Sequence, residues 1–394
     1  MSHTGLTGGG RAFYSGILLP ARKMSGITKD PSAAVRVIFY GSPMELSAEG
    51  HYHQTSMRLS TAAISIFSGI VVAGAVAGCT PVAVPAPSSL SSSAGRKPAL
   101  EQLPSELSIP YFSQMRLSGT GLTLTRVLRR ESAYAQHEIR YRSNGLTISG
   151  ILNIPEGAGP FPLVIFNHGH ISPSIYTVGR GLRREQDYLA RAGFAVLHTD
   201  YRGHGESDES PMVDKAYDGN LEYAMDSINA ILAVREAKLP RIDATRIGML
   251  GHSLGGGVTL AVLTSHPDLV NAAVLYAPVN SDVWENFSRW RREREKDDRT
   301  EEINGTRESN PDFWNALSPQ FYLKNINAPV LLFHGDRDKD VPKAWSDDLH
   351  ARLQALDKDI TYVEYAGEGH EYGPKWNDFM EKTAAFFHEH LSPP

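Results

Sequence analysis

The pattern of apolar and polar positions divides the chain into two kinds of predicted structure. Alternating apolar and polar residues at 122–130, 137–142 and 146–154 predict strands, and Asn144 and Gly145 predict a hairpin turn between the last two. Farther along, short apolar runs alternate with segments whose apolar residues recur at helical spacing. This order predicts an α/β domain with a mostly parallel central sheet, antiparallel N-terminal strands and helices on both faces.

The later strands and helices are predicted from apolar runs and from helical periodicity. The predicted strands occupy 162–167, 194–200, 247–250, 272–276, 330–333 and 360–365. The predicted helices occupy 184–192, 221–232, 254–263, 344–356 and 378–391. Because strand and helix alternate along this stretch, the sheet is expected to be parallel here and buried on both faces.

Between two of these strands, residues 281–320 form an insertion that differs from its surroundings. Its stretch WENFSRWRREREKDDRTEE is dense in charges of both signs and has Trp284, Phe287 and Trp290 at a spacing of three. One interpretation is a solvated helix with a packed aromatic stripe. The other is a lid whose aromatic face closes over an acyl pocket, with Trp284 and Trp290 as substrate contacts. The two interpretations are compatible, and both make 281–320 a small helical, lid-like insertion.

The first part of the chain has the composition of a targeting segment. Residues 1–56 show no sustained periodicity, whereas Met57 and Arg58 are followed by the uncharged run LSTAAISIFSGIVVAGAVAG and then by Cys79. A short basic start, an apolar core and small residues follow one another in this order in secretory signals. The tetrapeptide VAGC that ends at Cys79 resembles the lipobox of bacterial lipoproteins, in which the cysteine receives a lipid and becomes the mature N-terminus. Cys79 is the only cysteine of the chain, so it cannot form an internal disulfide.

These features predict four segments. They are an upstream extension at 1–56, a lipoprotein signal peptide at 57–78, a flexible Pro/Ala/Ser-rich tether at 79–108 and a folded domain at 109–394. A membrane-spanning helix and an ordinary cleaved signal are the alternatives for the apolar run. Lipidation of Cys79 would anchor the protein to a membrane of the bacterial cell envelope, facing outside the cytoplasm, in the periplasm or at the outer membrane.

The sequence RIGMLGHSLGGG places a serine between an apolar run and a predicted helix. Gly251, Ser253 and Gly255 spell GxSxG, the pattern of a nucleophile elbow, in which a strained strand-to-helix turn exposes the serine hydroxyl at the C-terminal edge of the sheet. Glycine is needed on either side because a Cβ there would collide with the neighbouring strand or helix. A glycine-rich turn with a chance serine has the same pattern, so the other catalytic groups must be found elsewhere in the chain.

A serine hydroxyl needs a histidine to take its proton and a carboxylate to orient that histidine. Both groups occur downstream, in loops that follow predicted parallel strands and in the chain order serine, acid, histidine. The sequence AGEGHEYGP offers His370, and HGDRDKDVP offers three carboxylates that could serve as the acid. The candidates are Asp336, Asp338 and Asp340, with Asp282 as a more distant alternative. Both loops lie at the edge of the sheet where the elbow lies, so they can converge on Ser253.

Five motifs follow one another along the later part of the chain. They are HG at 168–169, DxRGxGxS at 200–207, the GxSxG elbow, HGxxDxxVP at 334–342 and a GxGH that ends at His370. With these motifs the chain from about residue 140 to its end resembles the α/β-hydrolase superfamily, and most of all its prolyl-oligopeptidase-like (S9-type) and dienelactone-hydrolase-like esterase branch. In HGxxDxxVP the aspartate is the acid of the triad, so the resemblance selects Asp338.

The resemblance also implies which groups bind the negative oxygen of the tetrahedral intermediate. The donors would be the backbone N–H groups of Leu254, at the start of the elbow helix, and of His170, in the loop after the first parallel strand. A shift of register would give the second role to Ile171. No metal or organic cofactor is expected. The histidines in predicted turns, His168, His204 and His334, are not spaced along the chain as the ligands of a metal site are.

The implied function is hydrolysis of a carboxylic ester through an acyl-enzyme, with Ser253, His370 and Asp338 as the triad and a small-molecule ester or a short peptide as the substrate. An S9-type peptidase is the alternative. Such peptidases usually carry a β-propeller before the hydrolase domain, and the chain after Cys79 leaves no room for one, which favours the esterase. A non-catalytic binding lipoprotein is a third hypothesis, but it would not need an intact triad. The formal charge of −5 without a basic tract makes nucleic acid an unexpected partner, and the oligomeric state is left open.

Overall fold

The computed structural model describes residues 108–210, 218–296 and 299–392. The segments predicted as upstream extension, signal peptide and tether, Cys79 included, lie outside these ranges except for residue 108. Within the described ranges, none of the helices combines the length and the apolar character that crossing a bilayer requires. The structure therefore bears on the domain predicted at 109–394.

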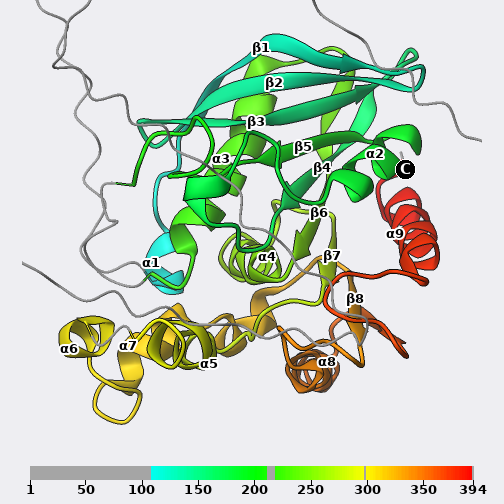
Figure 1. The fold of residues 1–394 in the computed structure, drawn as a ribbon. Coiled ribbons are helices and arrows are strands. Elements are labelled where there is room, and N and C mark those ends of the chain that lie inside the picture. The colour runs from blue at the N-terminus through cyan, green and yellow to red at the C-terminus, as the bar shows by residue number, and fades with distance from the viewer. Residues whose placement is uncertain (1–107, 211–217, 297–298, 393–394) are drawn as a thin grey trace, which may run out of the picture. The chain divides into compact units, whose positions relative to one another are not determined.

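A nine-stranded sheet runs through this domain in the order β1-β2-β3-β5-β4-β6-β7-β8-β9 (Figure 1). The strands are β1 Gly119–Arg130, β2 Tyr134–Ser143, β3 Leu146–Pro155, β4 Phe161–Asn167, β5 Ala195–Thr199, β6 Ile242–His252, β7 Ala272–Tyr276, β8 Val330–Gly335 and β9 Ile360–Tyr365. β1 to β3 pair antiparallel, as do β3 and β5, whereas the remaining pairs are parallel. The predicted sheet, mostly parallel with antiparallel N-terminal strands, is confirmed.

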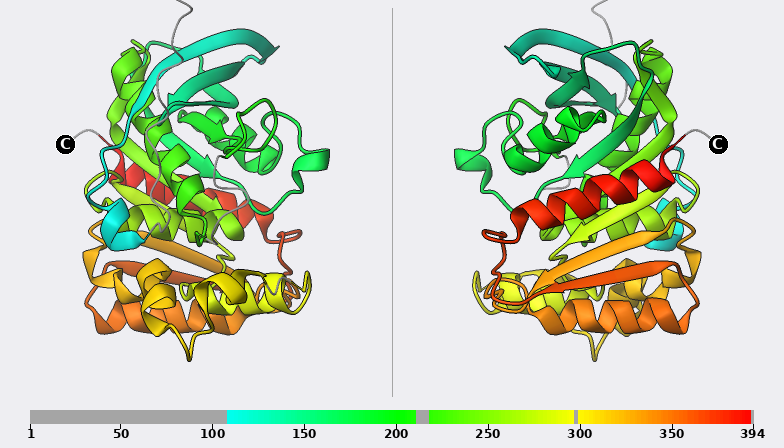
Figure 2. Two further views of the ribbon diagram at one scale, coloured as in Figure 1. Left: turned by 90° about the vertical axis from the view of Figure 1, so that its left-hand side faces the viewer. Right: turned by 90° about the vertical axis from the view of Figure 1, so that its right-hand side faces the viewer.

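Helices cover both faces of the parallel part of the sheet. They are α2 Arg183–Arg191, α3 Leu221–Ala237, α4 Leu254–Ser265, α8 Lys343–Ala355 and α9 Trp376–His390. The short helix α1 Ile109–Phe112 packs on α4, and the 3₁₀ turns are η1 Pro173–Ile175, η3 Pro319–Phe321 and η4 Leu323–Asn325. In β4, Leu163 and Ile165 join the hydrophobic cluster under α3, α4 and α8, whereas Val164 and Phe166 join the cluster under α2 and α9. Figure 2 shows α9 lying across the strands on this second face. Burial on both faces explains why apolar residues follow one another directly in β4 instead of alternating with polar ones.

The insertion forms several short helical turns rather than a single solvated helix. They are α5 Val283–Asn286, the π-helical turn η2 Phe287–Arg292, α6 Arg299–Asn304 and α7 Pro311–Leu317. Trp284 and Phe287 pack against Trp314 of α7, with ring centroids 4.7 Å and 5.1 Å from that of the tryptophan. All three rings are buried. The insertion therefore folds back around its own aromatic residues instead of laying one continuous helix on the surface.

Candidate active site

Ser253 lies in the sharp turn between β6 and α4. Its backbone has φ 57° and ψ −121°, a left-handed conformation that is strained for any residue with a side chain. The turn is held by hydrogen bonds: the N–H of Ser253 donates to the Tyr276 carbonyl at 3.0 Å, and its carbonyl accepts from the N–H of Gly256 at 2.9 Å and of Val279 at 3.1 Å. This geometry is that of a nucleophile elbow, and Ser253 lines the large cavity at the C-terminal edge of the sheet.

Two glycines let the elbow pack tightly. A Cβ on Gly251 would overlap the carbonyl oxygen of Gly255, and a Cβ on Gly255 would overlap that of Asn167 at the end of β4. A third glycine faces the serine directly, because a Cβ on Gly169 would lie 3.2 Å from the Cβ of Ser253. The absence of side chains at these positions brings the loop after β4 up to the nucleophile.

His370 and Asp338 come together from the loops after β9 and β8. The Nδ1 atom of His370 lies 2.7 Å from Oδ2 of Asp338. The other carboxylate oxygen of Asp338 accepts the N–H groups of Asp340 and Val341, each at 2.9 Å. His370 lines the cavity with Ser253, whereas the side chain of Asp338 is fully buried behind it. A histidine held at Nδ1 by a carboxylate presents Nε2 for proton transfer.

The other carboxylate candidates have different partners. Asp336 accepts the N–H of Gly367 at 2.6 Å. Asp282 caps α5, where it accepts the N–H of Trp284 at 3.0 Å and pairs with Arg307. Among the described residues, Asp338 is the carboxylate that contacts His370. This is the acid that the HGxxDxxVP resemblance selects.

The surroundings keep Asp338 ionised. Burial alone would raise the pKa of this carboxyl, but hydrogen bonds from His334 and His370 hold its pKa well below its usual range. His334 is fixed in turn, with Nδ1 2.7 Å from Oγ of Ser346 and Nε2 3.3 Å from the Asp338 carboxylate. The carboxylate that contacts Nδ1 of His370 is therefore negatively charged at neutral pH.

His252, inside the elbow motif, packs beside the nucleophile. Its ring centroid is 4.6 Å from that of His370, and its Nε2 lies 3.1 Å from the His370 carbonyl oxygen. Burial, followed by the proximity of His370, lowers the pKa of His252 to about 3. His252 is therefore neutral at physiological pH and serves to support the loop that carries His370.

The backbone groups expected to bind the oxyanion line the same cavity. His170 and Ile171 are in the loop after β4, and Leu254 is the first residue of α4, whose N–H has no acceptor within the helix. The loop is fixed on both sides of His170. The Nδ1 atom of His168 lies 2.7 Å from the carbonyl oxygen of Gly169. The Nε2 atom of His204 lies 3.1 Å from the carbonyl oxygen of Ile171.

Asp200, the first residue of DxRGxGxS, lies behind this loop. Its Oδ1 accepts from the Tyr176 hydroxyl at 2.9 Å and the Gly179 N–H at 2.8 Å, and its Oδ2 accepts from the Ser149 hydroxyl at 2.6 Å. Burial raises the pKa of Asp200 to about 6. Tyr176 and Gly179 belong to the segment that borders the cavity, so Asp200 ties this segment to β3. The motif was visible in the sequence, but this role was not.

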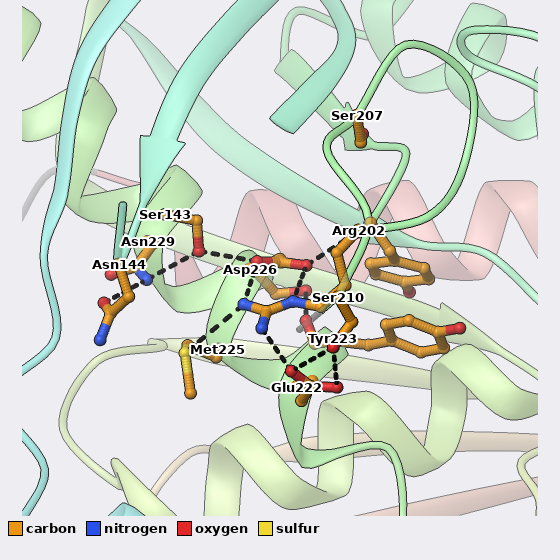
Figure 3. Close-up of polar contacts among 12 residues, drawn as sticks. Ser143, Asn144, Arg202, Ser207, Ser210, Glu222, Tyr223, Met225, Asp226 and Asn229 are labelled. Carbon is orange, nitrogen blue, oxygen red and sulfur yellow. Dashed lines mark hydrogen bonds and ion pairs between the residues drawn. The ribbon is translucent and has the colours of Figure 1, made fainter. Parts of the chain in front are cut away.

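Arg202 of the same motif anchors α3 to the active-site side of the sheet (Figure 3). Its guanidinium binds Asp226 with two nitrogens, at 3.0 Å and 2.7 Å, and donates to Glu222 at 2.6 Å. The Ser143 hydroxyl donates to the same aspartate at 2.6 Å. The charge of this buried arginine is therefore matched on both sides. In the sequence these carboxylates stand out only as acidic residues within an apolar helical period.

The two tryptophans of the insertion have different surroundings. Trp290 lines the cavity and makes an edge contact with Trp345, at 5.6 Å between ring centroids. Trp284, expected as a second substrate contact, is instead 7% exposed and packs in the core under the insertion. Between the two tryptophans the chain forms the π-helical turn η2, in which the N–H of Glu293 reaches back five residues to the Ser288 carbonyl at 3.1 Å. Even along a regular α-helix, residues six positions apart differ in direction by about 120°, so a spacing of three does not place Trp284 and Trp290 on one face.

The cavity that these groups line has a volume of about 1170 Å³. Its walls come from the loop after β4, the start of α2, the insertion and the loops that carry Asp340 and His370. Polar, charged and apolar side chains all contribute to them. Within the part of the chain that the structure describes, no cluster of three or more histidine, cysteine or acidic side chains could hold a metal ion.

The sequence was compared with known families and proteins. A model of the Prolyl oligopeptidase family matches residues 180–393. The protein named "Uncharacterized peptidase YuxL" from Bacillus subtilis (strain 168) is 28% identical over 284 residues, which are 68% of this chain but only 40% of that protein. "Uncharacterized peptidase YtmA" from the same organism is 28% identical over 258 residues, covering 63% of this chain and 93% of that protein.

The structure was compared with solved structures. An acetyl xylan esterase from Paenibacillus sp. R4 superimposes with a TM-score of 0.53 at 19% sequence identity, covering 70% of this chain and 91% of that one. A likeness at this identity establishes the fold alone. Together with the family match, it confirms the α/β-hydrolase architecture that the motifs predicted.

Proposed function

We propose that this chain, which belongs to the prolyl oligopeptidase family of serine hydrolases, cleaves carboxylic esters. The reaction would pass through an acyl-enzyme formed on Ser253. The observation that carries the proposal is the arrangement around the elbow. Ser253 and His370 line one cavity, and His370 is held at Nδ1 by the buried carboxylate of Asp338. This arrangement supports nucleophilic catalysis by the serine, which needs a histidine as base and a carboxylate that orients the histidine.

In the proposed reaction, Nε2 of His370 takes the proton of the Ser253 hydroxyl while the serine oxygen attacks the ester carbonyl. The N–H groups of Leu254 and His170 bind the negative oxygen of the tetrahedral intermediate. When the bond to the alcohol breaks, His370 returns the proton to the departing oxygen. Water then attacks the acyl-enzyme with His370 again as base, and the carboxylic acid leaves as Ser253 recovers its proton. Asp338 stays charged throughout and stabilises the imidazolium form of His370.

The relatives that this chain matches bear on its substrate class. The matched part of YuxL is less than half of that protein, so the resemblance to this peptidase does not extend to the whole of it. The acetyl xylan esterase is covered over nearly its whole length, as is YtmA, so this chain matches both an esterase and a protein named as a peptidase as a whole. The match to the esterase supports small esters as substrates. The names of YuxL and YtmA favour the alternative, a peptidase that acts on short peptides.

A substrate panel separates these two functions. The purified protein is expected to turn over short-chain aryl esters such as p-nitrophenyl acetate, with higher kcat/KM than for p-nitroanilides of short peptides that end in proline. Because the proposed mechanism uses no metal, EDTA should leave the rate unchanged. Release of p-nitrophenol and of p-nitroaniline is measured at the same enzyme concentration. Efficient peptide cleavage with negligible ester turnover would assign the protein to the peptidases instead.

We also propose that the protein is anchored in the bacterial cell envelope by a lipid on Cys79, a residue outside the described ranges. The support is the lipobox-like VAGC at the end of an uncharged run that contains the only cysteine of the chain. In its native host, Cys79→Ser is expected to move the protein from the membrane fraction to the soluble fraction, and mass spectrometry of the wild type should find no peptide from residues 1–78. Wild-type protein that is soluble, or a serine variant that stays on the membrane, would contradict lipidation.

A further inference from the structure

The insertion is fastened to the loop that carries the proposed acid. Arg289, in η2, donates from Nε to the carbonyl oxygen of Asp340 at 3.0 Å and from Nη2 to that of Lys339 at 3.3 Å. These residues directly follow Asp338 in the chain. A single guanidinium thus holds two consecutive carbonyl groups of this loop, a fork geometry that lysine cannot reproduce.

Aromatic rings hold the guanidinium in place. Its carbon lies 5.7 Å from the ring centroid of Trp290 and 5.8 Å from that of Trp345. Trp345 belongs to the first turn of α8, the helix that begins where the acid loop ends. Contacts of this kind between a cation and an aromatic face are attractive. Arg289 therefore joins three parts of the structure: the insertion, the acid loop and α8.

The hydrogen bonds of Arg289 connect directly to those of the acid. The peptide group between Lys339 and Asp340 accepts from Arg289 at its oxygen and donates its N–H to Oδ1 of Asp338 at 2.9 Å. Because a peptide group is planar and rigid, fixing its oxygen also fixes the direction of its N–H. Hydrogen bonds in such a chain also polarise one another. The chain continues through the Asp338 carboxylate to Nδ1 of His370.

We infer that Arg289 is a positioning residue for the triad, through which the insertion sets the orientation of the Asp338 carboxylate and hence of His370. The inference rests on the proposed Ser253, His370 and Asp338 mechanism and adds a residue to it that touches neither substrate nor the reacting atoms. It also gives the insertion a function beyond covering the cavity. Trp290, the next residue, lines the cavity, so a substrate that packs on its ring contacts the turn that holds the acid loop.

The test compares Arg289→Ala with Arg292→Ala in the full-length protein. Arg292 lies in the same π-helical turn but pairs with Glu301 at 3.2 Å and stacks on Trp284, away from the acid loop. For Arg289→Ala we expect kcat for p-nitrophenyl acetate to fall between about tenfold and about a hundredfold, because small displacements of catalytic groups cost rates of this size. KM should stay within about twofold, since the ester site is intact, and Arg292→Ala should behave as wild type.

The pH profile distinguishes positioning from a general loss of structure. A carboxylate that is poorly oriented stabilises the protonated form of His370 less, so the acidic limb of kcat/KM should move to lower pH in Arg289→Ala. The other titratable rings that face the pair, His252 and His334, are unchanged in this variant. An unchanged limb together with wild-type kcat would overturn the inference.

A double-mutant cycle identifies the route of the effect. If Arg289 acts through Asp338, adding Arg289→Ala to Asp338→Asn should cost no more than about twofold, because the interaction that it supports is already lost. Losses that multiply would overturn the inference. Arg289→Lys serves if the alanine variant does not fold: it keeps the cation but not the fork, so we expect an intermediate kcat, and a wild-type rate would again overturn it. Labelling of wild-type Ser253 by a fluorophosphonate tests the mechanism separately, since its absence contradicts the proposed function whatever Arg289 does.

Discussion

Replacement of Ser253 by alanine is expected to lower kcat for p-nitrophenyl acetate by about 10⁶, because the members of a triad act as a unit and removal of the nucleophile removes the acyl-enzyme route altogether. The fold should survive the change. The strained φ of 57° at this position is set by the backbone hydrogen bonds of the elbow rather than by the hydroxyl. Initial rates and thermal unfolding of wild type and variant measure the two parts of this expectation.

A matched control comes from the same helix. Ser265, at the end of α4, is buried, and its hydroxyl donates to the Ala261 carbonyl within the helix at 2.6 Å. It lies outside the residues that line the cavity. Ser265→Ala should therefore keep the wild-type kcat and the reaction with fluorophosphonates, whereas Ser253→Ala should lose both. Substantial turnover by Ser253→Ala would show that the elbow is not the site of the chemistry.

The sequence was sufficient for those features that follow from local pattern and from the topology of parallel sheets. Apolar runs placed the strand at Ala272–Tyr276 and the strand at Ile360–Tyr365 at their observed bounds. Because parallel strands end at one edge, the loops after β8 and β9 had to meet near the elbow, as Asp338 and His370 do. Spacing could not choose among the carboxylates of HGDRDKDVP. That choice needed the family motif, and the structure gives its physical reason: the loop curls so that Asp336 faces Gly367.

Other parts of the site depend on contacts between residues far apart in the chain. Asp200 accepts hydrogen bonds from Ser149 in β3 and from Tyr176 in the segment after β4. The spacing of residues along the chain gives no sign that these partners meet. The prediction that both tryptophans of the insertion contact the substrate was wrong for a different reason. Residues six positions apart differ in direction by about 120° along a regular α-helix, so a spacing of three could not place both tryptophans on one face, and the structure has Trp290 at the cavity and Trp284 in the core. The contacts of Arg289 are with backbone carbonyls, which every residue type carries, so the sequence holds no signal for them.

The second large effect is expected at the acid. Asp338→Asn should lower kcat by about 10⁴, because an amide in place of the carboxylate cannot hold His370 in the tautomer that leaves Nε2 free, nor stabilise its protonated form. The hydrogen bonds from His334 and His370, which keep the pKa of Asp338 well below its usual range, ensure that the wild-type residue is charged throughout the neutral range. The loss should therefore persist at every pH at which the protein is folded. Steady-state rates measured across the neutral and alkaline range check this.

The neighbouring aspartates supply the controls for this prediction. In Asp336→Asn the amide oxygen can still accept the N–H of Gly367, so kcat should stay within about tenfold of wild type, and Asp340→Asn should stay within the same limit, because neither side chain contacts His370. A collapse of kcat in Asp336→Asn or in Asp282→Asn, with Asp338→Asn near wild type, would assign the acid to the other residue. If all four variants kept most of the activity, the hydrogen bond of 2.7 Å between Asp338 and His370 would have a structural role, and the group that orients the catalytic base would have to be sought elsewhere.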